Sequence, residues 1–441
     1  TSTCVGCGEC VQACPTGALM PSKEVGLVTP DKKVDSVCPY CGVGCLLTYN
    51  IKDDKILYAE GRDGPANMSR LCVKGRYGFN YVNSDQRLTV PLARKEGVSK
   101  DINPEDFDLN NIEKYFEPIS WDDAIKRTTE KFKSLVMNDS KSTAGFGCAK
   151  GSNEEAYLFQ KLVRTGFRNN NVDHCTRLCH ASSVVALVEM IGSGAVSNQV
   201  ADVAEADTII VIGANPTVNH PVAATFIKNA AKAGKNLIVL DPRKNDLARH
   251  ATHYLQFKPD TDVALLNAIM KSIIDQNLID QKFINERTTD FDDLRSHLDD
   301  FTPEKMSSIC GIDADVIHEV ARIYASSSAS IIFWGMGVSQ HIHGTDNARA
   351  LISLALMTGQ VGRPGTGLHP LRGQNNVQGA SDSGLIPMVY PDYQRVDNPG
   401  VNKFFEKFWE TKLDKNPGLT VVEIMEEITK GVIKGLYVMG E

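Results

Sequence analysis

Short apolar runs and longer helical stretches succeed one another along the middle of the chain. Residues 208–212 and 237–240 are apolar without alternation, and residues 222–233 between them have helical periodicity. Apolar runs of this length, separated by a helix, predict strands buried on both faces in a βαβ unit. Further strands are expected near residues 254–257 and 330–334. The pattern predicts an α/β fold with a doubly wound parallel sheet, whose ligand loops lie at the carboxyl ends of the strands.

The loops that follow these predicted strands lack the G-x-G-x-x-G fingerprint of dinucleotide-binding folds. The nearest approach is Gly335-Met336-Gly337, which follows a strand but is too short to indicate NAD binding. The ligand of these loops is therefore expected to be another nucleotide-like group.

Twelve cysteines change this picture, because eight of them fall into two tight runs. Clustered cysteines in a large chain are more often metal ligands than disulfide partners, which favours a reducing, cytoplasmic location. The first run has the spacing of bacterial ferredoxins, in which the fourth cysteine often ligates a second cluster. Its members are Cys4, Cys7, Cys10 and Cys14. The second run predicts one [4Fe-4S] cluster, with a four-thiolate zinc site as the alternative. Its members are Cys38, Cys41, Cys45 and Cys72.

Length and charge restrict the possible classes of protein. A chain of 441 residues exceeds what one hydrophobic core usually serves, so two or more domains are expected. The formal net charge is -7 and no basic stripe carries interleaved aromatic residues, so nucleic acid is not an expected partner. No apolar stretch reaches the roughly 18 residues of a membrane span. The chain starts at Thr1 inside a cysteine motif and stops just after a strand-like run, so we expect a fragment cut at both ends.

Cys179 and His180 are adjacent in the segment RLCH. A soft thiolate beside a titratable imidazole, in a chain with iron–sulfur motifs, points to redox chemistry at a metal. Together with CPYCGVGC, Cys72-Val73-Lys74-Gly75, GMGVSQHIHGTDNAR and HPLRGQNNVQGASD, this segment resembles the molybdenum- or tungsten-dependent formate dehydrogenases of the dimethyl sulfoxide reductase superfamily. The ferredoxin-like start is similar to the catalytic (alpha) subunit of the soluble NAD-linked enzymes. The resemblance covers essentially the whole chain and implies reversible oxidation of formate to CO2.

The resemblance also implies the chemistry of individual residues. The metal, Mo or W, would be held by two molybdopterin guanine dinucleotides and by Cys179. His180 would either accept the proton released from formate or tune the metal centre. Arg349 matches the arginine that pairs with the carboxylate of formate, and Arg372 and Arg177 are lesser candidates for the same pocket.

Lys74 resembles the lysine that lies between the cluster and the proximal pterin. Electrons would pass through it to the cluster of the second cysteine run and then to the ferredoxin-like segment. A diaphorase subunit bearing flavin and iron–sulfur clusters is the implied partner, with NAD as acceptor. The alternatives are a nitrate reductase, a formylmethanofuran dehydrogenase, or a non-catalytic electron-transfer subunit related to the large subunit of NADH dehydrogenase. Family nitrate reductases carry methionine in place of His180, and this difference favours formate as the substrate.

Two groups of cofactor-binding residues follow from the resemblance. Backbone amides at strand-to-helix turns can bind pyrophosphate, and an aspartate can accept hydrogen bonds from guanine. The expected nucleotide-binding residues are Gly213, Asn215, Asp241, Arg243, Pro259 and Asp262. The pterin cleft is expected to be lined by Gly335, Gln340, Gly373, Gln374 and Asn376.

The implied domains follow the order of these motifs. Residues 1–30 form a partial ferredoxin-like segment and residues 36–97 a [4Fe-4S] domain. Residues 175–351 form an α/β domain that binds the guanine dinucleotide and carries the metal ligand. A second molybdopterin-binding α/β domain is discontinuous and combines residues 98–174 with 352–441. Full-length members of the family continue into a C-terminal barrel domain, which we expect to be absent here.

Overall fold

The computed structural model describes residues 4–20 and 29–440 of the chain. Its internal contacts divide the chain into two compact units, each assembled from two separate stretches. Unit 1 contains Thr1–Phe79 and Cys175–Gly379, and unit 2 contains Asn80–His174 and Ala380–Glu441.

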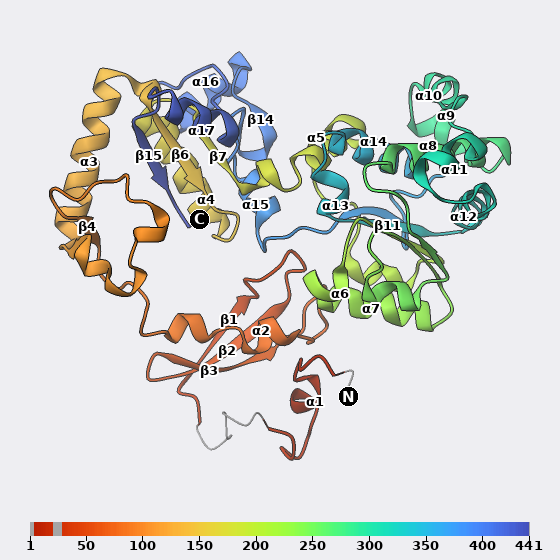
Figure 1. Ribbon diagram of the computed structural model, residues 1–441, viewed down its shortest axis with the longest axis horizontal. Coiled ribbons are helices and arrows are strands. Elements are labelled where there is room, and N and C mark those ends of the chain that lie inside the picture. Colours follow the sequence, from red (N-terminus) through yellow and green to blue (C-terminus); the bar gives the residue numbers. More distant parts are fainter. Residues whose placement is uncertain (1–3, 21–28, 441) are drawn as a thin grey trace. The chain divides into compact units, whose positions relative to one another are not determined.

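The central sheet of unit 1 has five parallel strands in the order β10-β9-β8-β11-β12. The strands are β8 (Thr208–Ile212), β9 (Asn236–Leu240), β10 (His253–Leu255), β11 (Ser330–Trp334) and β12 (Gly367–Pro370). Alternate strand residues pack on α7 (Pro221–Lys232) from one face and on α8 (Asp262–Asp275), α12 (Ala314–Ser326) and α14 (Gly344–Met357) from the other. Figure 1 shows these helices on opposite sides of the sheet. The predicted parallel α/β fold is confirmed.

The strand order of this sheet reverses between β8 and β11. From β8 the chain adds β9 and β10 on one side, whereas β11 and β12 extend the sheet on the other. The loops after β8 and β11 therefore meet at a topological switch point, where open α/β sheets bind ligands.

The second stretch of unit 1 ends at Gly379, whereas the corresponding predicted domain ends at residue 351. Helix α14 runs through that position, and β12 pairs in parallel with β11. Residues 352–379 therefore belong with the middle of the chain, because their strand completes its sheet. Four residues that begin with glycine and end with proline give too weak an apolar signal to predict a strand.

The N-terminal part of unit 1 is a small cysteine-bearing region. Its three-stranded antiparallel sheet has the order β1-β2-β3. The loop between β1 and β2 carries Cys38, Cys41 and Cys45, and Cys72 directly precedes α2. The elements are α1 (Glu9–Gln12), β1 (Lys32–Val37), β2 (Leu46–Lys52), β3 (Lys55–Gly61) and α2 (Val73–Tyr77).

Unit 2 is built on a three-stranded parallel sheet in the order β15-β6-β7. The pairing of β6 with β15 joins its two separate stretches of chain. The strands are β6 (Thr143–Gly147), β7 (Val172–His174) and β15 (Gly435–Val438), with short pairs β4 (Leu92–Arg94) with β5 (Phe116–Pro118) and β13 (Val389–Tyr390) with β14 (Gln394–Arg395). Its helices include α3 (Trp121–Asn138), α4 (Asn153–Lys161), α16 (Pro399–Phe408) and α17 (Val421–Thr429).

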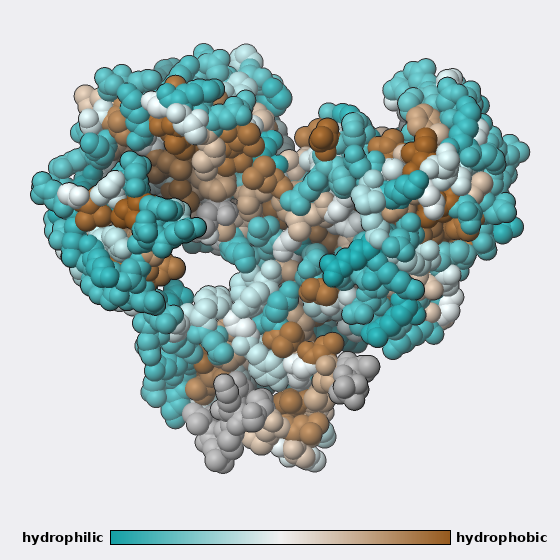
Figure 2. Space-filling view, viewed as in Figure 1, coloured by the Kyte–Doolittle hydropathy of each residue, from teal (hydrophilic) through white to brown (hydrophobic). Residues whose placement is uncertain are grey.

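The remaining helices connect these elements. They are α5 (Ala181–Ile191), α6 (Pro216–Asn219), α9 (Gln281–Arg287), α10 (Phe291–Leu298), α11 (Pro303–Cys310), α13 (Met336–Ser339) and α15 (Val377–Asp382). Within the described residues, no helix combines the length and the apolarity that crossing a bilayer requires. On the face shown in Figure 2, hydrophilic residues predominate and apolar residues lie in separate patches.

Candidate metal and cofactor site

The four thiols of the second cysteine run line one small cavity in unit 1. The lining consists of Cys38, Cys41, Cys45 and Cys72 with Tyr40, Leu71, Gly75, Pro221 and Val222. Burial raises the pKa of the Cys38 thiol to about 11 and also raises the pKa of Cys41 and of Cys45, so thiolates here need a cationic group beside them. In the part of the chain that the structure describes, no three Cys, His, Asp or Glu side chains are grouped to hold a single metal ion. Four thiols around a cavity fit a multi-iron cluster better than the zinc ion considered as the alternative.

The first cysteine run lies on the short N-terminal segment that contains α1. Cys4 and Cys10 are exposed, and Cys7 and Cys14 are half-buried. Hydrogen bonds, the strongest of them from the Thr16 side chain, lower the pKa of Cys14 to about 7. The assignment of these four thiols as cluster ligands stays a prediction.

Cys179 occupies a buried position just before α5. Its residue is 7% exposed, and its Sγ lies 3.6 Å from Sδ of Met336 on α13. Gly373 faces the thiol, since a Cβ added to Gly373 would lie 3.9 Å from Sγ. Burial raises the pKa of the thiol, while the Gly373 amide and the charge of Arg372 act in the opposite direction. The structure thus brings Cys179 together with the segments that follow β11 and β12.

His180 lies at the end of a directed chain of hydrogen bonds. The indole N–H of Trp334 donates to Ser183 Oγ at 2.8 Å, which leaves the Ser183 hydroxyl to donate to Ser339 Oγ at 2.7 Å. The Ser339 hydroxyl can then donate to His180 Nδ1 at 3.0 Å, while Nε2 of the same ring donates to the Leu371 carbonyl at 3.1 Å. Burial, followed by the nearby Arg372 charge, lowers the pKa of His180 to about 3. This imidazole is therefore neutral, with both ring nitrogens engaged by the protein.

Arg372, and not Arg349, is the arginine beside Cys179. Arg372 is buried, its charge acts on the pKa of both Cys179 and His180, and its Nη2 donates to the Gly194 carbonyl at 2.7 Å.

Arg349 lies on the outer side of α14 with its side chain 44% exposed. The Arg349 guanidinium pairs with the carboxylates of Glu189, at 2.6 Å, and Asp346, at 3.0 Å. The structure therefore does not bring Arg349 to Cys179, because its place on the helix directs it to surface partners. The other lesser candidate, Arg177, is half-buried.

Lys74 lies between the cluster cavity and the segment that contains His220. Its ammonium donates to the Val218 carbonyl at 3.4 Å. Burial dominates the pKa of both Cys38 and His220, but the charge of Lys74 acts on each of them. A single positive charge on α2 is therefore within electrostatic reach of the cluster thiols and of the neighbouring histidine.

Glycines allow the loops after β8 and β11 to touch at the switch point. Gly213 has a φ of +55°, and its carbonyl accepts a hydrogen bond from the Gly337 amide at 3.0 Å. A Cβ added to Gly335 would lie 2.7 Å from the Gly213 oxygen, which is closer than packing allows. Backbone groups therefore form the surface of the switch point, as a bound phosphate or pterin requires.

Asp262 is a buried carboxylate at the start of α8. It is 2% exposed, and its Oδ1 has no hydrogen-bond partner among the residues that the structure describes. Burial raises its pKa to about 6. A buried acceptor that lacks a donor fits the N–H groups of a guanine edge. His341, which sequence reasoning missed, lies near this carboxylate and pairs with Asp260 at 3.3 Å.

The other predicted cofactor residues lie on loops at the same ends of the strands. Asn215 follows β8, Asp241 and Arg243 follow β9, and Pro259 follows β10. The Asp241 carboxylate accepts from the Arg243 amide at 2.8 Å, which shapes the turn after β9. The Gln340 side chain donates to the Leu178 carbonyl and ties the end of α13 to the residue before Cys179.

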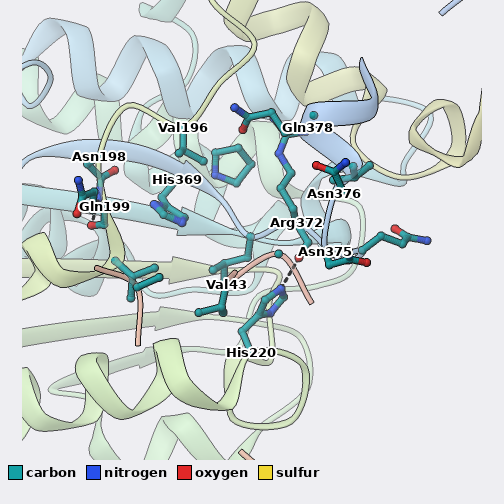
Figure 3. A pocket seen from close by; sticks show the side chains of 18 of the residues that line it. Val43, Val196, Asn198, Gln199, His220, His369, Arg372, Asn375, Asn376 and Gln378 are labelled. Atoms are coloured by element: carbon teal, nitrogen blue, oxygen red, sulfur yellow. Dashed lines mark hydrogen bonds between the residues drawn. The ribbon is translucent and has the colours of Figure 1, made fainter. Parts of the chain in front are cut away.

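A cavity of about 220 Å³ in unit 1 lies between the cysteine loop and the segment after β12 (Figure 3). His220 Nε2 donates to the Arg372 carbonyl at 2.6 Å, while Nδ1 of His220 and Nδ1 of His369 have no partner in the described chain. Burial lowers the pKa of both histidines, that of His369 to about 3. Two neutral acceptors on histidines that line this cavity fit a flat heterocycle with N–H donors, such as a pterin. Gln374 and Asn376, predicted for the pterin cleft, line the same cavity.

The two cavity histidines and Met336 were not predicted from the sequence as site residues. Each histidine precedes a proline, in His220-Pro221 and in His369-Pro370. Both His-Pro dipeptides lie beside segments that carry other predicted site residues. Their repetition could therefore have indicated that the two histidines belong to the site. Met336 lies inside the quoted glycine-rich segment, and nothing in the sequence distinguishes it from a core methionine.

Comparisons with known proteins agree with this arrangement. Residues 87–441 match the molybdopterin oxidoreductase family, residues 31–84 match the molybdopterin oxidoreductase Fe4S4 domain, and residues 1–20 match a 4Fe-4S binding domain. These matches confirm the predicted cofactors, a molybdopterin with Mo or W and [4Fe-4S] clusters.

Several curated relatives are similar over most of the chain. The F420-dependent formate dehydrogenase subunit alpha of Methanocaldococcus jannaschii is 41% identical over 93% of this chain and 58% of its own length. Formate dehydrogenase H of Escherichia coli is 37% identical over 93% of this chain and 56% of its own length. The chain therefore spans somewhat more than half the length of these relatives.

Among solved structures, acetylene hydratase from Pelobacter acetylenicus has a similar fold. Its TM-score is 0.64 at 23% identity, and the match covers 74% of this chain and 43% of that chain. The family model matches residues 87–441, which is well over half of this chain, so the chain belongs to the molybdopterin oxidoreductase family.

Proposed function

We propose that this chain is the catalytic portion of a formate dehydrogenase, which interconverts formate with CO2 and two electrons. The observation that carries the proposal is the buried Arg372 guanidinium beside Cys179. A guanidinium pairs two donors with the two oxygens of a small carboxylate, and formate is the smallest. The names of the relatives from Methanocaldococcus jannaschii and Escherichia coli support formate over nitrate or formylmethanofuran as the substrate.

Different residues of the site bind the substrate and hold the redox cofactor. When bound, the molybdopterin metal ligated by Cys179 supplies the two-electron redox chemistry. Arg372 holds the substrate carboxylate near this ligand, and the buried surroundings strengthen that ion pair. His180 serves as a positioning group, because Ser339 and the Leu371 carbonyl engage both of its ring nitrogens.

Electrons leave through the cluster of the second cysteine run, with Lys74 on the path, and then through the first run. The acceptor that we favour is NAD, reached through a flavin-bearing partner subunit, since the chain carries a ferredoxin-like segment for onward transfer. F420 is the competing acceptor, because it appears in the names of two relatives that are 41% and 38% identical to this chain.

The full-length protein, purified with its partners, tests this proposal in one set of assays. Formate should reduce the artificial acceptor benzyl viologen, and nitrate should not oxidise reduced viologen. Parallel assays with NAD and with F420 then identify the natural acceptor. If a preparation with full metal content reduced viologen at a rate that did not depend on added formate, the proposed activity would be contradicted.

A further inference from the structure

A buried arginine on α2 joins the first cysteine run to the rest of the cysteine-bearing region. The Arg76 side chain is 5% exposed, and its guanidinium donates to three groups of the N-terminal segment. Nε donates to the Cys7 carbonyl at 2.7 Å, Nη1 to Gln12 Oε1 at 2.7 Å, and Nη2 to Glu9 Oε1 at 2.5 Å. The contact with Glu9 is an ion pair, so the buried charge of Arg76 is compensated where it lies.

Further hydrogen bonds fix the same segment to the chain around α2. Glu9 Oε1 also accepts from the Leu71 amide at 2.9 Å. The Gln12 amide exchanges two hydrogen bonds with the backbone of Gly61, each 2.9 Å long. The N-terminal segment is thus held by polar contacts immediately before Cys72 as well as by Arg76.

Gly8 permits this close approach. It has a φ of +73°, and a Cβ at this position would overlap the Arg76 side chain and the Tyr77 hydroxyl. The residue between Cys7 and Glu9 must therefore be glycine for both conformational and steric reasons.

We infer that Arg76 is a positioning residue for electron transfer between the two iron–sulfur clusters. Cys72 occupies the N-cap position of α2 and is a predicted ligand of one cluster, and Arg76 follows it by one helical turn. The guanidinium then bonds to the carbonyl of Cys7, which is a predicted ligand of the other cluster. The Arg76 side chain therefore connects α2, which starts at Cys72, to the backbone of Cys7 in the first cysteine run.

The contacts of Arg76 set the separation of the clusters because they are charge-assisted and buried, so a displacement would break several strong hydrogen bonds together. The transfer itself is a single-electron step. The electron lost by the cluster of the second run is gained by the cluster of the first run, and no proton or other reactant takes part. The inference depends on the presence of both clusters, but not on formate being the substrate.

The test compares Arg76→Met with wild type in the full-length protein with its partners. Dithionite reduces both clusters, and low-temperature EPR then measures the magnetic interaction between them. Arg62→Met is the matched control, since Arg62 directly follows β3 with its side chain 37% exposed and pairs with Asp35 at 3.6 Å. Wild type and Arg62→Met should show the interaction, and Arg76→Met should lose it while its iron and sulfide content stays unchanged.

Retention of the full interaction in Arg76→Met, or its absence from wild type with both clusters present, would overturn the inference. If Arg76→Met loses iron, Gln12→Leu decides the question, because it removes one acceptor of Arg76 and the bonds to Gly61 without touching a cysteine. A weakened interaction in Gln12→Leu supports the inference, and an unchanged one rejects it. Since dithionite is the reductant, a protein that fails to oxidise formate can still pass this test.

Discussion

The amide of Gly42 donates a hydrogen bond to the carbonyl oxygen of Arg372, with the two atoms 3.2 Å apart. The same carbonyl accepts from Nε2 of His220 at 2.6 Å. Gly42 belongs to the loop of the second cysteine run, so the loop that carries the cluster thiols rests on the backbone of the arginine beside Cys179. The geometry of that loop and the position of the Arg372 backbone are therefore linked directly.

Gly42→Ala should disturb both ends of this link. A Cβ at position 42 would lie 2.6 Å from Arg372 Cβ and 2.7 Å from its carbonyl oxygen, so one backbone must move. We expect a higher KM for formate, a changed EPR spectrum of the cluster, and a loss of about 1–3 kcal/mol in unfolding free energy from overpacking. Gly44→Asn is the control, because Gly44 has a φ of +72° but nothing within 4 Å of an added Cβ. Wild-type kinetics and EPR in Gly42→Ala would refute the link.

Arg372→Lys should weaken formate binding far more than Arg349→Lys. Lysine keeps the positive charge but loses the two parallel donors, so kcat/KM should fall by about 10²-fold, equivalent to about 2.7 kcal/mol. The matched change at Arg349 removes a surface ion pair with Glu189, which contributes little. Steady-state kinetics at equal metal content measure both. If Arg349→Lys lost as much kcat/KM as Arg372→Lys, the assignment of Arg372 would be wrong.

The sequence predicted the sheet better than it predicted which arginine lies beside Cys179. The apolar runs at residues 208–212 and 330–334 coincide with β8 and β11, because strands buried on both faces leave a continuous apolar signal. Arg349 lies in a specific motif, but its side chain shares the outer side of α14 with Asp346 and Ser353, neither of which is buried. Helical periodicity alone could therefore have placed Arg349 on the surface.

The position of Arg372 could not be predicted in the same way. It follows a four-residue strand, and its backbone carbonyl is held by Gly42 and His220, which are distant in sequence. Pairwise contacts of this kind arise from tertiary packing, which local propensity and spacing do not encode.

Asp262→Asn should change how stability depends on pH. The folded-state pKa of Asp262 is about 6, above its ordinary value of 3.8, so the folded protein binds this proton more tightly than the unfolded chain. The unfolding free energy of the cofactor-free wild type, relative to the variant, should therefore fall by up to about 3 kcal/mol as the pH rises from about 4 through 6. Differences in Tm between the two proteins across this range measure the effect. A difference that stays constant with pH would contradict the burial of this carboxylate as the cause of its raised pKa.

Lys74→Ala should slow reduction of the cluster without slowing reduction of the metal by formate. Lys74 acts electrostatically on the cluster thiols and on His220, whereas Cys179 is approached by Arg372 and Gly373. Stopped-flow absorbance should therefore show two separated phases in the variant. Lys55→Ala, at an exposed position on β3, is the control and should behave as wild type. Slow metal reduction with fast cluster reduction would instead assign Lys74 to the substrate pocket.

Cluster reduction by formate in a full-length Cys179→Ala protein tests the central claim most directly. Cys179 belongs to neither cysteine run, so dithionite should still reduce the clusters of the variant as it does those of the wild type. Formate should reduce them several orders of magnitude more slowly, because the metal has lost its protein ligand beside Arg372. Cluster reduction by formate within about tenfold of the wild-type rate, a difference of about 1.4 kcal/mol in barrier, would contradict the assignment of Cys179 and with it the proposed site.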